Sequence, residues 1–334
     1  MNIHFRLHSR RTPPRHAHAN ALRLLLALGL SACVLTATAT AASAANPGAS
    51  TLAASHVTYA AATLNGKVDP RGQATTYVFQ YGTTRGYGAQ TPLSPAGAGN
   101  GYVKVSQTVT GLSPITVYHY RVVATGPNGV NVAGGDRTFA TGPVPLSLAI
   151  AGVPNPVPFG SPVLVEGTLS GTGAASHPVQ LQANPFPYTA GFAAVGNTQL
   201  TNASGTFSFP YLGLTANTQL RVVTVGKPLV SSSIVLENVS VRVSFHVRAT
   251  KRPGYARLYG TVTPAEVGAL VGFQLLRPGN KSLNRGGTVV KAATASYSTF
   301  SRVVPVKRGL YKALVQVSDD GAHVSGYSSP VLIR

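Results

Sequence analysis

Residues 111–122 read Gly-Leu-Ser-Pro-Ile-Thr-Val-Tyr-His-Tyr-Arg-Val, and this stretch decides the fold. Its apolar and small residues alternate at a period of two, which is the spacing of a β-strand. One face carries Tyr118, Tyr120, Val122 and Ala124, and the other carries His119, Arg121 and Val123. Pro114 suits the turn before the strand because it cannot donate to a ladder. Gly-Pro-Asn-Gly at residues 126–129 ends the strand, and its Asn-Gly pair predicts a hairpin.

The run Leu-x-Pro-x-Thr-x-Tyr that ends at Tyr118 resembles the tyrosine corner of fibronectin type III domains, in which a Tyr hydroxyl bonds to nearby backbone. The resemblance spans residues 51–141, including ATLNGKVDP at 62–70, TYVFQYG at 76–82 and RTF at 137–139. It implies a module like those of secreted bacterial proteins. The chain has no Trp, so Leu64 is expected where many such modules have an early-strand Trp.

Weaker copies of the pattern recur twice downstream. In residues 213–220, Leu220 occupies the position that corresponds to Tyr118. In residues 309–317, Tyr311 occupies that position and predicts a second tyrosine corner. Residues 239–247 alternate strictly and predict one strand that opens a further module. Turn signals every 8–12 residues predict an all-β chain. We therefore expect three tandem antiparallel β-sandwiches. These are a fibronectin type III-like domain at 46–142 and two modules that resemble bacterial immunoglobulin-like folds, at 143–238 and 239–334.

The first 45 residues predict an export signal. Five arginines and no acid precede the short apolar run at 24–30, and Ala42-Ser43-Ala44 is a small-residue cleavage pattern. Two alternatives stay open. Leu30-Ser31-Ala32-Cys33 resembles the lipobox of bacterial lipoproteins, which would put a lipid on Cys33, and the segment could also remain as an uncleaved anchor. Each outcome predicts a secreted or envelope-attached protein, and after signal removal no transmembrane span is expected.

The charge and the cysteine content limit the kinds of site and partner that the chain could have. Cys33 is the sole cysteine, so a chain cleaved at Ala44 can hold no disulfide, no cysteine-ligated zinc and no cysteine nucleophile. Residues 239–334 contain fourteen Lys or Arg and three Asp or Glu, a net charge of +11, against +4 for 46–142 and zero for 143–238. A field of that size attracts polyanions, although a basic surface can also serve solubility alone.

No catalytic constellation emerges. Asp319-Asp320 is the one adjacent pair of acids, and it lies in an Asp-Gly turn rather than in a pattern typical of glycosidases. No Gly-x-Ser-x-Gly elbow accompanies the histidines, and no paired His spacing or calcium loop predicts a metal. We expect no enzyme activity, no cofactor and no metal. The leading hypothesis is a non-enzymatic binding or scaffold protein. The alternatives are an accessory carbohydrate-binding protein and an extracellular hydrolase whose site is not recognised.

Two segments are candidates for ligand contact. Basic residues interleaved with aromatics in the last module suit an anionic polymer, such as a cell-wall polymer or another polysaccharide, and nucleic acid is not expected. These basic residues are Arg248, Lys251, Arg252, Arg257, Arg277, Lys281 and Arg285. The other candidate is the aromatic loop with Phe186, Tyr188 and Phe192, whose rings could stack on a sugar, contact another surface protein or merely cap the sandwich.

Overall fold

A computed structural model of the chain describes residues 45–151, 154–279, 281–318 and 321–334. Cys33, nearly all of the predicted export signal, and Asp319-Asp320 lie outside the described residues. Every regular element that is described is a β-strand, and the strands pair antiparallel except for one short parallel pair. The predicted all-β fold class is therefore confirmed.

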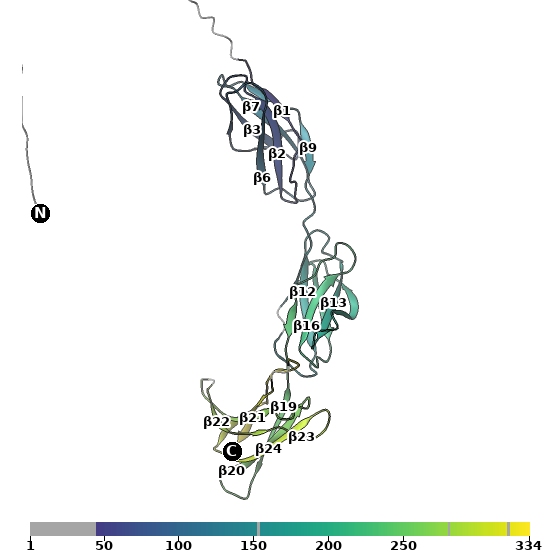
Figure 1. Cartoon of the computed structure of the whole chain (residues 1–334), viewed down its shortest axis with the longest axis vertical. Coiled ribbons are helices and arrows are strands. Elements are labelled where there is room, and N and C mark those ends of the chain that lie inside the picture. The colour runs from purple at the N-terminus through teal and green to yellow at the C-terminus, as the bar shows by residue number, and fades with distance from the viewer. Residues whose placement is uncertain (1–44, 152–153, 280, 319–320) are drawn as a thin grey trace, which may run out of the picture. The chain divides into compact units, whose positions relative to one another are not determined.

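The first sandwich consists of two sheets, and the strand that contains Tyr118, β7, lies in one of them (Figure 1). One sheet has the order β1-β2-β6, and in the other β7 pairs with β3, β8 and β9 while β4 and β5 pair with β3. The strands are β1 (Gly48–Thr51), β2 (Ala61–Asp69), β3 (Thr75–Gly82), β4 (Ala89–Gln90), β5 (Ser94–Gly97), β6 (Val103–Thr110), β7 (Val117–Thr125), β8 (Asn131–Ala133) and β9 (Arg137–Ala140).

The predicted faces of β7 match its burial. Tyr118, Tyr120, Val122 and Ala124 are buried in the core, with Leu64 beside them at zero exposure. The Tyr118 hydroxyl accepts a hydrogen bond from the Ser113 N–H at 2.9 Å, which is the bond of a tyrosine corner. Val123 lies on the other face but is buried as well. Gly129 adopts a φ of +76° in the turn between β7 and β8, where the Asn-Gly pair predicted a hairpin.

The second sandwich pairs a sheet of order β10-β12-β15 with a sheet of order β14-β13-β16-β17. Its central strand β16 contains Leu220, which is fully buried as the counterpart of Tyr118. The strands are β10 (Ser147–Ile150), β11 (Val157–Pro158), β12 (Val163–Ser170), β13 (Pro178–Pro185), β14 (Ala193–Leu200), β15 (Thr206–Tyr211), β16 (Thr218–Thr224), β17 (Val235–Glu237) and β18 (Val239–Ser240).

The third sandwich repeats the plan with sheets β19-β20-β24-β23 and β22-β21-β25-β26, and β27 also pairs with β25. Tyr311 on β25 is fully buried, and its hydroxyl accepts a bond from the Lys307 N–H at 3.0 Å. The strands are β19 (Arg242–Ala249), β20 (Tyr255–Thr263), β21 (Leu270–Arg277), β22 (Lys281–Val289), β23 (Lys291–Ala292), β24 (Ser298–Pro305), β25 (Gly309–Gln316), β26 (Gly326–Tyr327) and β27 (Val331–Ile333).

The strand predicted at 239–247 is interrupted. Val239 belongs to β18, which pairs parallel with β11, and its side chain is buried in the core of the second sandwich rather than the third. The alternating strand of the third sandwich, β19, begins at Arg242. Alternation continues through both segments, so the sequence pattern could not show that they serve different cores. The boundaries at 142/143 and 238/239 remain predictions.

Candidate functional site

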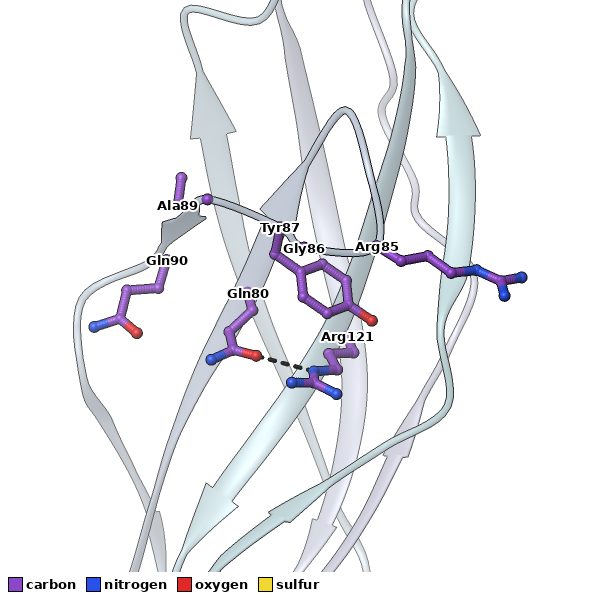
Figure 2. Close-up of a pocket in the computed structure, with 8 residues that line it drawn as sticks. Gln80, Arg85, Gly86, Tyr87, Ala89, Gln90 and Arg121 are labelled. Carbon is purple, nitrogen blue, oxygen red and sulfur yellow. Dashed lines mark hydrogen bonds between the residues drawn. The ribbon is translucent and has the colours of Figure 1, made fainter.

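A surface cavity of about 470 Å³ lies on the first sandwich beside the loop from β3 to β4 (Figure 2). Arg121, on β7, lies under the Tyr87 ring with its guanidinium carbon 4.6 Å from the ring centre. Its Nε donates to the Gln80 side-chain oxygen at 2.9 Å, as Figure 2 shows. The guanidinium already has two partners on this surface.

Asp136 organises the polar cluster next to this cavity. Its carboxylate accepts from the Tyr87 hydroxyl at 3.1 Å, lies 2.8 Å from His119 Nδ1 and lies 3.4 Å from Arg85 Nε. Burial opposes the charge of Asp136, but the bonds from His119 and Tyr87 outweigh it and lower the pKa of the carboxyl. Burial, followed by the bond to Asp136, raises the pKa of Tyr87.

This cluster pairs a histidine with a carboxylate but offers no nucleophile. In the described part of the chain, no serine or threonine hydroxyl is hydrogen-bonded to His119. Within the same residues, no group of three His, Cys, Asp or Glu side chains could hold a metal ion. Tyr87 and Arg85 belong to the β3–β4 loop and His119 belongs to β7, so the observed role of the network is to tie this loop to β7 through Asp136.

The seven basic residues predicted to contact a polyanion are divided between the two sheets of the third sandwich. Arg248 and Arg257 lie on β19 and β20, and Lys251 and Arg252 lie in the turn between these strands. By contrast, Arg277, Lys281 and Arg285 lie on β21 and β22 of the opposite sheet. The two sheets enclose one core, so the two groups belong to different sheets of the sandwich. The sequence could not separate the two groups because it shows charge but not which sheet each strand joins.

Arg252, Arg277 and Arg285 differ in the residues that surround them. Arg252 stacks on the Tyr255 ring with its guanidinium carbon 3.9 Å from the ring centre. Arg285 is half-buried, and its Nε has no hydrogen-bond partner. Arg277 pairs in register with Lys281, and both are exposed beside the β21–β22 turn.

Arg248 and Arg257 help to line a cavity of about 510 Å³ on the outer face of β19, β20 and β24. Tyr259, one of the aromatics interleaved with the basic residues in the sequence, also lines it. The remaining lining residues, which sequence reasoning did not assign to a site, are Ser244, His246, Gly260, Thr261, Thr299, Phe300 and Ser301. The alternation along residues 239–247 predicted a strand with one buried and one solvated face, but the contribution of β24 depends on pairing that is remote in sequence.

The predicted aromatic loop offers little free ring surface. Phe186 and Tyr188 are half-buried and pack edge to face, with ring centres 5.7 Å apart. The guanidinium carbon of Arg221 lies 4.1 Å from the centre of the Phe192 ring. These contacts favour the capping interpretation that the sequence left open.

Comparisons with known proteins add no functional assignment. No protein-family model and no curated protein matches the chain. Among solved structures, the chain is similar to the FN1-FN3 domains of chicken CNTN1, at 13% identity and a TM-score of 0.30, over 87% of this chain and 100% of that one. It is also similar to trypsin-activated alpha-2-macroglobulin from Escherichia coli, at 12% identity and a TM-score of 0.25, over 85% of this chain and 23% of that one. Scores this low carry no inference about function or domain arrangement.

Proposed function

We propose that the chain is a non-enzymatic modular binding protein of a bacterial surface or medium, and that its third sandwich binds anionic polymer of the cell envelope. The single observation that carries the proposal is the charge of residues 239–334, which hold fourteen basic and three acidic residues. Among the described residues of this sandwich, no arginine or lysine forms an ion pair with a carboxylate. Such charge is available to an external polyanion.

The proposed location rests on residues 1–45, whose basic, apolar and small-residue regions follow the order of an export signal. Lipid attachment at Cys33 is the alternative route to the same surface. In the described segments, no helix is long and apolar enough to cross a membrane.

Co-sedimentation with purified bacterial cell walls tests this function. We expect the purified protein to pellet with the walls at about 50 mM salt and to be released at about 200 mM, because contacts with a polyanion weaken steeply over that range. A variant with Arg248, Arg257, Arg277 and Lys281 all replaced by Gln should remain in the supernatant.

The matched control removes four charges from the first sandwich instead, by replacing Lys67, Arg71, Arg85 and Lys104 with Gln. This control should still pellet. Failure of the unmodified protein to pellet at low salt, or equal loss in both variants, would contradict the proposal that the third sandwich is the binding module.

A further inference from the structure

The outer face of the sheet β19-β20-β24-β23 is arranged in rows that cross the strands. Directly paired residues of antiparallel strands point to the same face. One row joins Arg248, Arg257 and Val303, and the next joins His246, Tyr259 and Ser301. The third row joins Ser244, Thr261, Thr299 and Lys291. The first row therefore carries two positive charges, the second carries two aromatic rings and the third carries three hydroxyls. Together the three rows form the face that contains the 510 Å³ cavity.

The Arg248–Arg257 pair is electrostatically unfavourable in the isolated chain. The two arginines are cross-strand partners, and like charges in that position destabilise a sheet. Both are exposed, and neither has an ion-pair partner among the described residues. The four strands of this sheet contain no Asp or Glu. An anion bound between the two guanidiniums would remove this repulsion, and a carboxylate fits the planar fork of Arg.

The two rows beside the arginine row have the side chains needed to contact a sugar ring and its hydroxyl groups. Tyr259 is 38% exposed, and its ring centre lies 5.5 Å from that of His246, which holds the two rings together on the surface. Ser244 and Thr261 hydrogen-bond each other at 2.7 Å, and Thr299 and Ser301 lie on the next strand. Aromatic rings provide apolar contact area, and hydroxyls both donate and accept hydrogen bonds.

We infer that this face is a binding site for a carboxylated polysaccharide, a chain of hexuronate residues. Arg248 and Arg257 bind the carboxylates, Tyr259 with His246 supports the apolar face of a sugar ring, and the serine and threonine row bonds its hydroxyls. The inference rests on the proposed polyanion-binding function and assigns that function to one sheet and one ligand class. A linear polyphosphate would use the arginines but would leave the rings and the hydroxyl row without a role.

Binding of the purified protein to oligogalacturonate, measured by calorimetry at about 50 mM salt, tests the site. Replacing Arg248 and Arg257 together with Gln should weaken binding at least about tenfold, since hydrogen bonds to charged groups are among the stronger ones. The matched control replaces Arg277 and Lys281 with Gln. It removes the same charge from a directly paired couple on the other sheet. It should change affinity by no more than about twofold, because neither residue belongs to the rows that contain Arg248 and Arg257.

Two further ligands distinguish recognition of the sugar ring from attraction by charge alone. Polyphosphate of equal charge and the methyl ester of oligogalacturonate are titrated in parallel. Tyr259→Leu should weaken oligogalacturonate binding at least about fivefold and leave polyphosphate binding unchanged, whereas Tyr259→Phe should retain most of the affinity. The neutral ester should bind weakly, because it lacks the carboxylates.

The outcomes are distinguishable. Equal affinity for both polyanions, together with no effect of Tyr259→Leu, would overturn the polysaccharide inference while leaving polyanion binding intact. Equal losses in the two double variants would overturn the assignment to this sheet. If neither polyanion binds the folded protein, the proposed function itself fails.

Discussion

At the scale of single residues, two tyrosine hydroxyls fix the chain before the central strands of the first and third sandwiches. Tyr118 accepts from the Ser113 N–H and Tyr311 from the Lys307 N–H, and both rings are buried. The Tyr118 ring also stacks on Phe139, with ring centres 5.5 Å apart. Loss of the hydroxyl would leave a backbone donor unpaired without changing the packing of the ring.

Tyr118→Phe should therefore destabilise the first sandwich by about 1 kcal/mol, the net value of one hydrogen bond. The free energy of unfolding can be followed by calorimetry or by hydrogen exchange of the first sandwich. Tyr59→Phe, at an exposed ring, is the control and should be neutral. An unchanged transition for Tyr118→Phe would show that the hydroxyl bond contributes nothing to stability.

Glu237 on β17 makes stability depend on pH. Its side chain is fully buried, neither carboxyl oxygen has a hydrogen-bond partner, and burial raises the pKa of the carboxyl from 4.5 to about 7. The folded protein thus holds a proton that the unfolded chain releases above about pH 4.5. The contribution of Glu237 to the free energy of unfolding is greatest below that pH, falls as the pH rises to about 7, and is constant above it, with a total loss of about 3 kcal/mol at most.

Glu237→Gln should remove this pH dependence, because the amide does not titrate. Melting temperatures of the second sandwich measured between pH 4.5 and 8 provide the comparison, and Glu166→Gln, at an exposed position, should keep the unmodified profile. A Glu237→Gln profile that still falls across this range would assign the dependence to another group. The sequence could not predict this burial, because a Glu near the end of a short strand ordinarily faces water.

At the scale of elements, a glycine recurs in an inner strand of the smaller sheet of each sandwich. Gly66, Gly167 and Gly260 lie on β2, β12 and β20. A Cβ on Gly167 would come within 2.3 Å of the Phe207 ring, and one on Gly260 within 2.6 Å of the Phe300 ring. Phenylalanine rings fill the space beside Gly167 and Gly260, whereas the side chain of Val122 lies nearest to Gly66. Alternation in the sequence predicted the strands, but it could not predict which ring covers which glycine, because the partners are about forty residues apart.

Gly260→Ala should destabilise the third sandwich by about 1–3 kcal/mol, the usual cost of overpacking. The added methyl group would also lie 1.9 Å from the Ser244 carbonyl oxygen, so β19 must move. Gly272→Ala on β21 is the control, since its Cβ would meet nothing within 4 Å. Urea unfolding monitored through the third sandwich gives both values, and equal stabilities of the two variants would contradict the close packing around Gly260.

At the scale of the whole molecule, charge is distributed by sandwich. The concentration of basic residues in 239–334 could be predicted from the sequence because it is a sum over residues. The division of these residues between two sheets could not, since it depends on which strands pair. The same limit explains why Arg248 and Arg257, which the sequence offered as candidates, could not be grouped with Ser301 and Thr299 of β24, which line the same cavity.

The most direct test of the central claim is the salt dependence of binding to dextran sulfate, measured for the unmodified protein and for the two four-site variants. The logarithm of the binding constant should fall steeply with the logarithm of salt concentration. The slope should become shallower by about two units when Arg248, Arg257, Arg277 and Lys281 are replaced by Gln, chiefly through the loss of Arg248 and Arg257. Replacing Lys67, Arg71, Arg85 and Lys104 should leave the slope nearly unchanged. Equal slopes for the two variants would show that the third sandwich is not the polyanion-binding module.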